Sequence, residues 1–210
     1  MADSLETPES PSVDQSALID LVQMIARLRA ECGWKAAQTH RTLAKHLLEE
    51  TYETIEAIEA LEDGGTFDHL CEELGDLLLQ VYLHAAIAAQ AGEFDIEDVA
   101  RGLREKMLRR NPHVFGDVTE TDPARINDTW ESVKAAEKQR SDVLDGIPLD
   151  LPALSRAAKV LDRLDRAGTS LPPADPADLG DRLLALVAEA RETGVDPEQA
   201  LRDAVRRVSA

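Results

Sequence analysis

The most apolar part of the chain runs over residues 74–89, where only Asp76, Gln80 and His84 are strongly polar. These three residues are spaced four apart, so in an α-helix they form one line along an otherwise apolar surface. The pattern predicts a helix that is buried nearly all round and carries one polar stripe. A buried carboxylate is costly unless a cation or a hydrogen-bond donor faces it, so the stripe indicates that Asp76 has a binding partner.

Apolar residues also recur at helical spacing in the segments around this stretch. We predict helices over residues 13–31, 40–62, 67–90, 96–110 and 123–140, a loop at 33–38 and a turn at 113–117. Thr39 and Asp95 are suited to cap the helices that follow them. No segment has the alternation of a β-hairpin, and aromatic residues make up only 3% of the chain. The sequence therefore predicts an all-α fold.

Composition divides the chain into three parts. Residues 1–12 are rich in proline, serine, threonine and acids, which is typical of a disordered arm. We expect residues 13–140 to form the main helical domain. Prolines and a glycine within residues 146–152 indicate a linker, so we assign 141–210 to a linker followed by a second helical part.

The second helical part resembles a portion of the first. Residues 179–184 echo residues 74–79, and residues 196–208 echo residues 95–108. This similarity predicts a shortened copy of the second half of the main domain. The copy keeps Asp181 but has no acid-rich helix before it, so we interpret it as packing or interface material.

The net charge of −18 limits the classes of partner. Such a charge argues against nonspecific binding to nucleic acid or to anionic membranes, and an anionic substrate would need bridging cations. Cys32 and Cys71 form no disulfide framework. With no leader-like segment and no apolar run of about 18 residues, we expect a cytoplasmic protein.

Two predicted helices each carry a pair of acids three residues apart: Glu50 and Glu53 on the first, Glu73 and Asp76 on the second. One interpretation is a solvated acidic surface, since the first helix carries a long acidic run. The other is a hard-cation site, because facing helices with such pairs can surround a metal ion with oxygen ligands. The histidines argue against a di-iron site, because such sites normally use Glu-x-x-His on two helices and none of the five histidines has an acid three residues before it.

The clustered cations lie at the end of the helix over residues 96–110. Lys106 and Arg110 belong to this group, which either complements the helix dipole or binds phosphate. Further on, Trp130 and Lys134 stand one turn apart on the helix over residues 123–140. Trp130 is either a packing residue or a platform for a nucleobase.

Three motifs together resemble the MazG nucleoside triphosphate pyrophosphohydrolases, an all-α group related to dimeric dUTPases. They are the segments Leu47–Glu53 (LLEETYE), Glu72–Leu78 (EELGDLL) and Arg109–Phe115 (RRNPHVF). The resemblance covers about residues 16–140 and implies a four-helix-bundle-like catalytic domain. The family's loop usually reads Cys-Pro-Trp-Asp where this chain has Cys32-Gly33-Trp34-Lys35.

The resemblance implies Mg²⁺-dependent hydrolysis of nucleoside triphosphates to monophosphate and pyrophosphate, in a nucleotide-pool housekeeping role and within a homodimer; Mn²⁺ is an alternative metal. Glu50, Glu53, Glu73 and Asp76 would bind the metal. Either Glu49 or Glu72 would accept the proton of the attacking water, and the sequence does not choose between them. By position, Lys106 and Arg110 would bind the phosphates, and Trp130 and Lys134 the nucleotide. The alternative is a MazG-like interaction module without strong catalysis.

Overall fold

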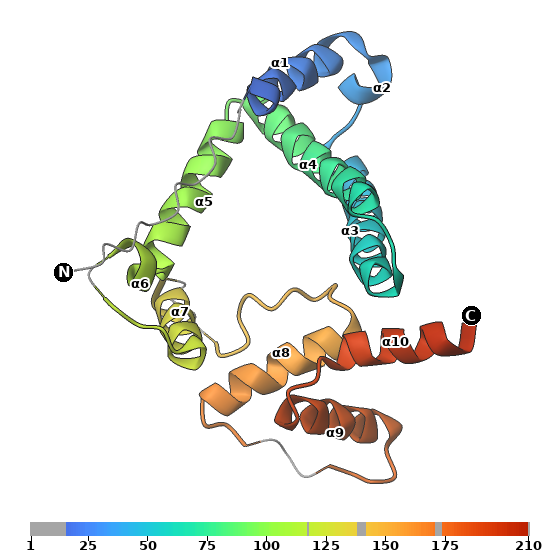
Figure 1. Cartoon of the computed structure of the whole chain (residues 1–210), viewed down its shortest axis with the longest axis vertical. Helices are drawn as coiled ribbons and strands as arrows, with labels where there is room; N and C mark the ends of the chain where they lie inside the picture. The colour runs from blue at the N-terminus through green and yellow to red at the C-terminus, as the bar shows by residue number, and fades with distance from the viewer. Residues whose placement is uncertain (1–15, 117, 138–141, 171–173, 210) are drawn as a thin grey trace, which may run out of the picture. The chain divides into compact units, whose positions relative to one another are not determined.

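The computed structural model describes residues 16–116, 118–137, 142–170 and 174–209, all of whose regular structure is helical. The predicted disordered arm, residues 1–12, lies outside this range. Figure 1 labels the helices, which are α1 (Ser16–Glu31), α2 (Gly33–Ala36), α3 (His40–Ala60), α4 (Phe67–Gln90), α5 (Ile96–Arg110), α6 (Pro112–Phe115), α7 (Pro123–Glu137), α8 (Ala153–Arg166), α9 (Leu179–Glu192) and α10 (Pro197–Ser209), with a short 3-10 helix, η1 (Leu61–Asp63), after α3. The all-α prediction is confirmed.

The helices predicted over 40–62, 67–90 and 96–110 are found with small shifts at their ends, and for those predicted over 13–31 and 123–140 the residues 13–15 and 138–140 lie outside the described range. Helix α8 was not predicted as a separate helix, and neither were two one-turn helices. The loop expected at 33–38 contains α2, and the turn expected at 113–117 overlaps α6. Four residues are too few to show an apolar period, so sequence patterns do not reveal them. No helix in the described part of the chain has the length and apolar character needed to cross a membrane.

Local capping explains where the central helices begin and end. Thr39 accepts a hydrogen bond from the Thr42 backbone N–H at 3.2 Å, and Asp95 accepts one from the Asp98 N–H at 3.0 Å, so both predicted caps are confirmed. After α4, Gly92 adopts a φ of +75°, a conformation that glycine reaches without a steric penalty. Gly194 ends α9 in the same way, with a φ of +73°.

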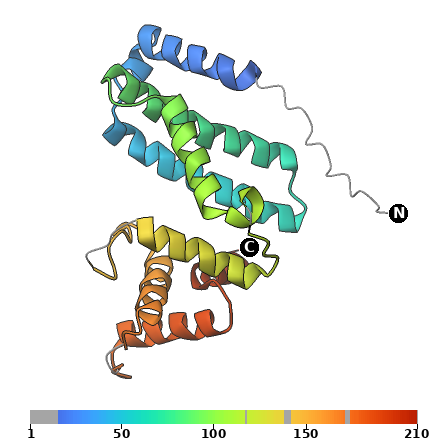
Figure 2. The same ribbon diagram turned by 90° about the vertical axis from the view of Figure 1, so that its left-hand side faces the viewer.

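The chain divides into two compact units, residues 1–118 and 119–210. The first unit is built on α3 and α4, which pack side by side in both views (Figures 1 and 2). The second unit contains α7 to α10. The division groups α7 with the C-terminal helices, whereas the sequence analysis placed the boundary at 140/141; that boundary stays a prediction.

The core of the first unit is small. Ile25 from α1, Leu43 from α3, and Tyr82 and Leu83 from α4 form its buried cluster. The Tyr82 hydroxyl donates a hydrogen bond to the Leu18 carbonyl at 3.1 Å, which joins α4 to α1. These contacts hold α1 against one side of α4 and leave another side to pack against α3.

Arg29 of α1 links the segment between α1 and α3 to α4. Its side chain is only 7% exposed, and its guanidinium donates to the Gln90 amide oxygen, at 2.7 Å from one nitrogen, and to the backbone carbonyls of Lys35 and Gln38. The forked guanidinium suits such a set of acceptors. Arg29 therefore ties the α2–α3 loop to the end of α4.

The second unit is held by a smaller core and by ion pairs. Leu161 of α8 and Val187 of α9 are its buried apolar residues among those described. Arg166 of α8 pairs with Glu131 of α7 at 2.9 Å, and Arg191 of α9 pairs with Asp162 of α8 at 3.6 Å. The unit thus has its own packing, as expected for a separate helical part.

The expectation that α4 is buried nearly all round is wrong for the single chain. Leu74 is 50% exposed and Val81 is 41% exposed, although Gln80, Tyr82 and Leu83 are buried. Two neighbouring helices, α1 and α3, cover only part of the surface of an apolar helix. The sequence pattern shows that the surface of α4 is apolar, but it does not show how much of that surface the other helices of one chain can cover.

Candidate functional site

The backbones of α3 and α4 are joined close to the predicted metal ligands. Thr54 of α3 is buried, and its hydroxyl lies 2.8 Å from the Glu50 carbonyl and 3.4 Å from the Glu73 carbonyl on α4. A buried hydroxyl between two carbonyls fixes the spacing of the helices at this level. The side chains of Glu50 and Glu73 therefore start from a defined separation.

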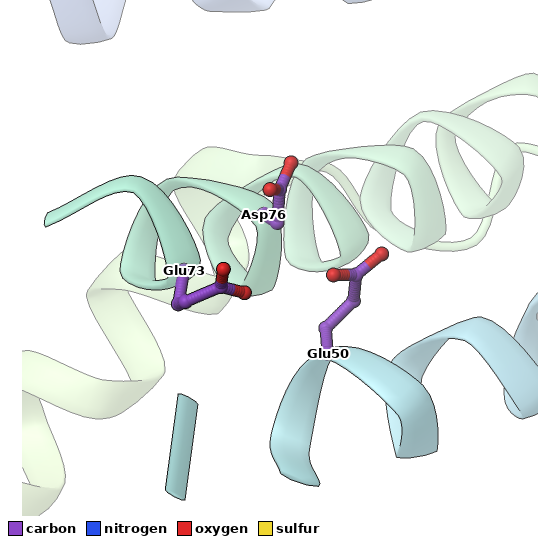
Figure 3. Close-up of side chains that lie close together, drawn as sticks. All are labelled: Glu50, Glu73 and Asp76. Carbon is purple, nitrogen blue, oxygen red and sulfur yellow. The ribbon is translucent and has the colours of Figure 1, made fainter. Parts of the chain in front are cut away.

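Three of the four predicted metal ligands come together here. One carboxylate oxygen from each of Glu50, Glu73 and Asp76 lies within 4.8 Å of the others, and all three residues are half-buried. Figure 3 shows Glu50 reaching from α3 toward α4, where Glu73 and Asp76 lie one helical turn apart. In the described part of the chain, no lysine or arginine forms an ion pair with these three carboxylates.

The electrostatics of this cluster favour a bound cation. Burial raises the pKa of Glu50, and the nearby charges of Asp76, Glu53 and Glu73 raise it further. A carboxyl group in this position is harder to ionise than one in water, because like charges repel. A divalent cation would remove that penalty, and carboxylate oxygens are the ligands that hard cations prefer.

Gln80 extends the site along the polar stripe of α4. It is 4% exposed, and its amide nitrogen lies 3.5 Å from a carboxylate oxygen of Glu50. Its amide oxygen is buried and has no hydrogen-bond partner among the described residues. A buried polar atom normally has a partner, so the site contains a neutral oxygen that is free to accept one.

The remaining predicted acids lie at the edge of the cluster. Glu53 is exposed and outside the three-carboxylate group, although its side chain hydrogen-bonds with Glu50. Glu49 is exposed and lies 2.9 Å from the His46 ring nitrogen. Glu72 is exposed on α4. The structure thus places the two candidate proton acceptors beside ligand positions but does not choose between them.

The predicted phosphate-binding cations do not join the cluster within one chain. Lys106 is half-buried and Arg110 is 8% exposed. Both lie in the second half of α5, which begins beside the end of α4 and then turns away from it (Figure 1). Because the carboxylates lie near the other end of α4, we infer that these cations do not face them in a single chain.

Trp130 and Lys134 belong to the second unit. The Lys134 ammonium lies 4.6 Å from the centre of the Trp130 ring and 2.7 Å from a carboxylate oxygen of Glu131. Burial raises the pKa of the Glu131 carboxyl, but Lys134 and Arg166 outweigh this effect and leave it below its usual range. The side-by-side placement expected from the sequence is present.

Two features near the start of α3 were missed by the sequence analysis. A groove of about 480 Å³ is lined by Trp34, Gln38, Arg41, Thr42, Lys45 and His46. Beside α4, the Nδ1 atoms of His40 and His84 lie 2.7 Å apart with their rings stacked. The only sequence signal for the pair was the position of His84 on the polar stripe, which indicated a polar partner but not its identity.

Comparisons with known proteins place this geometry in context. Residues 38–115 match the family model of the MazG nucleotide pyrophosphohydrolase domain. The chain is 43% identical over 201 residues to an uncharacterized 26.1 kDa protein in the blaB 3' region of Streptomyces cacaoi, covering 94% of this chain and 81% of the relative. It is 40% identical over 214 residues to the nucleoside triphosphate pyrophosphohydrolase/pyrophosphatase MazG of Thermotoga maritima, covering 90% of this chain and 81% of the relative. A crystal structure of a mazG-related protein from Thermotoga maritima aligns with 26% identity and a TM-score of 0.47, over 56% of this chain and 98% of that one.

Proposed function

The chain belongs to the MazG nucleotide pyrophosphohydrolase family, and we propose that it hydrolyses nucleoside triphosphates to nucleoside monophosphates and pyrophosphate with Mg²⁺ as its cofactor. The observation that carries this proposal is the cluster of Glu50, Glu73 and Asp76, three half-buried carboxylates from two helices. Enzymes named nucleoside triphosphate pyrophosphohydrolase are 36% and 40% identical to this chain over most of its length.

The residues present fit a divalent cation. All three clustered side chains offer oxygen, and no lysine or arginine among the described residues pairs with them; a ring nitrogen of His69 lies 3.5 Å from a Glu73 carboxylate oxygen. The Gln80 amide, whose oxygen has no partner among the described residues, lies beside Glu50. Glu53 would join as a further carboxylate from the same turn of α3. When bound, Mg²⁺ or Mn²⁺ supplies charge that offsets the triphosphate and lowers the pKa of a water molecule.

The chain's own groups would position the substrate and move one proton. A water oxygen bonds to phosphorus, the anhydride bond between the α- and β-phosphates breaks, and the water proton passes to Glu49 or Glu72. Lys106 and Arg110 would hold the departing pyrophosphate by charge-assisted hydrogen bonds. Trp130 and Lys134 would contact the nucleotide.

We propose that a homodimer completes this site. In one chain, α5 carries Lys106 and Arg110 away from the carboxylates (Figure 1). Large apolar side chains are exposed on the helices of the first unit, among them Leu18, Ile19, Leu48, Ile58, Leu74, Val81 and Leu103. Exposed apolar surface on this scale is typical of an interface between subunits. A second copy would cover it and could bring its α5 cations to the site.

The substrate preference that we propose is broad. Trp130 can stack on any nucleobase, and the groove beside Trp34 has a volume suited to part of a nucleotide. Such breadth fits a housekeeping role on ordinary or damaged nucleotides in the cytoplasm. The two cysteines, Cys32 and Cys71, are free thiols, as a reducing compartment would maintain them.

Product analysis tests this proposal. The protein is incubated with each of the common NTPs and dNTPs, with Mg²⁺ or with EDTA, and the products are identified by ³¹P NMR. We expect monophosphate and pyrophosphate in equal amounts, only when Mg²⁺ is present. Diphosphate and orthophosphate would contradict the reaction, and no turnover of any nucleotide would favour the interaction module. Strict selectivity for dUTP would contradict the broad preference.

A further inference from the structure

Two buried polar atoms on α4 lack hydrogen-bond partners among the described residues: the amide oxygen of Gln80 and the Nε2 atom of His84. The two residues are four apart, so their side chains are neighbours on one side of the helix. A buried polar atom without a partner is costly. The Gln80 amide lies beside the carboxylate cluster, because its nitrogen is 3.5 Å from a Glu50 carboxylate oxygen.

The other ends of these two side chains are engaged. The Gln80 amide nitrogen faces a carboxylate oxygen of Glu50 at 3.5 Å. The His84 Nδ1 atom lies 2.7 Å from Nδ1 of His40, with the two ring planes 9° apart. One of these two histidine nitrogens must carry a proton and the other must accept it. The unpaired atoms of Gln80 and His84 are therefore the ends that remain.

We propose that Gln80 is a further ligand of the divalent cation, and that its side-chain amide rotates by half a turn when the cation binds. This inference rests on the proposed metal site. The rotation exchanges the amide nitrogen and oxygen, so the oxygen faces the cation beside Glu50. The amide nitrogen then takes the place that the unpaired oxygen holds now.

The rotation follows from the charges at the site. Without a cation, Glu50, Glu73 and Asp76 leave negative charge facing Gln80, so the amide presents its N–H groups. With a cation, an amide oxygen is a suitable ligand that adds no negative charge to the cluster. The rotated state therefore gives the Gln80 oxygen, which has no partner among the described residues, a cation to bind.

Calorimetric titration of the full chain with Mg²⁺ tests the ligand. Gln80→Met keeps the length of the side chain and its helix propensity but removes the oxygen. We expect the Mg²⁺ dissociation constant to rise about tenfold or more, on the scale seen when groups that support a metal site are lost. Gln90→Met is the matched control, because it changes the same residue type on the same helix about three turns beyond Gln80 and further still from the cluster. It should destabilise the fold through Arg29 and leave Mg²⁺ affinity unchanged.

Unchanged Mg²⁺ affinity in Gln80→Met would overturn the proposed ligand and would leave the enzymatic proposal intact. If the unmodified protein binds no Mg²⁺, the metal site itself is wrong, and this inference is overturned with it.

Discussion

Replacing Glu50 by glutamine should stabilise the first unit when metal is absent and weaken it relative to the original protein when Mg²⁺ is present. The cluster oxygens lie within 4.8 Å of one another. Two unit charges at that distance repel by about 0.9 kcal/mol in water and about 3.5 kcal/mol at an effective dielectric constant of about 20. Glu50 faces two such partners, but the residues are only half-buried, so solvent and salt screen part of the repulsion. We therefore expect a gain of about 2 kcal/mol in the free energy of unfolding.

With Mg²⁺ present, the original protein should be more stable than Glu50→Gln. A ligand at about 100 times its dissociation constant stabilises the folded state by about 2.7 kcal/mol. Glu50→Gln loses a charged ligand and should gain much less from Mg²⁺. Urea unfolding at neutral pH, in EDTA and in Mg²⁺, measures both differences. Added NaCl should narrow the difference seen in EDTA, because salt screens repulsion between partly exposed charges.

Asp181→Asn is the matched control for this change. It also removes one carboxylate charge, but in the second unit, where Asp181 lies in the first turn of α9 and accepts a hydrogen bond from the Asp175 N–H at 2.8 Å. Negative charge is favourable at a helix N-terminus, so this change should cost about 0.3–1 kcal/mol and should not respond to Mg²⁺. Equal responses of Glu50→Gln and Asp181→Asn would refute the repulsion at the cluster.

The structure predicts the sign of the pH dependence of the unfolding free energy. The folded-state pKa of Glu50 lies above its unfolded value, mainly through burial and then through Asp76. The folded protein therefore holds the proton more tightly, and stability from this group falls as pH rises from the unfolded pKa through the folded pKa. In EDTA, the stability that Glu50→Gln gains over the original protein should be complete at pH values above the folded-state pKa of Glu50. It should be absent at pH values below the unfolded-state pKa. A constant advantage at all pH values would refute the electrostatic explanation.

Three further predictions concern other parts of the chain. Glu53→Gln should lower the rate of NTP hydrolysis by orders of magnitude while circular dichroism shows an intact fold, whereas Asp181→Asn should leave the rate nearly unchanged; a large loss in both would mean that the second unit contributes to catalysis. Arg29→Lys keeps the charge but loses the forked donor set, so the Gln38 carbonyl and the Gln90 amide oxygen lose a donor; urea unfolding should show a loss of about 1–3 kcal/mol, and no loss would show that the contacts of Arg29 are dispensable. Trp130→Leu should raise KM for all nucleotides by a similar factor in steady-state assays, and a change for one base alone would contradict stacking without selectivity.

The sequence predicted the central helices and three members of the cluster because both depend on local spacing. The bounds of α4 agree with the predicted 67–90, since a cap at Thr66 and a turn at Gly92 frame one long apolar period. Glu73 and Asp76 are three residues apart on that helix, so they share one side of it whatever else packs there. Glu50 joined them because the apolar surface of α3 also packs on α4.

Other features depend on where separate helices lie relative to one another. The sequence showed that Lys106 and Arg110 form a basic helix end but not that α5 turns away from the carboxylates in one chain. It showed His84 on the polar stripe but not that His40, 44 residues earlier, would meet it at 2.7 Å. The contacts of Arg29 were also hidden, because its acceptors are a distant glutamine and two backbone carbonyls.

The proposed metal site is tested most directly by anomalous diffraction from a crystal of the unmodified protein soaked in Mn²⁺. We expect an anomalous peak within about 2–2.6 Å of oxygens from Glu50, Glu73 and Asp76, the range for hard cations bound by oxygen. The refined structure should place the Gln80 amide within ligand distance of the same peak, which identifies the facing atom as its oxygen. A protein that hydrolyses NTPs in Mn²⁺ but shows its Mn²⁺ away from these three carboxylates would contradict the proposed site.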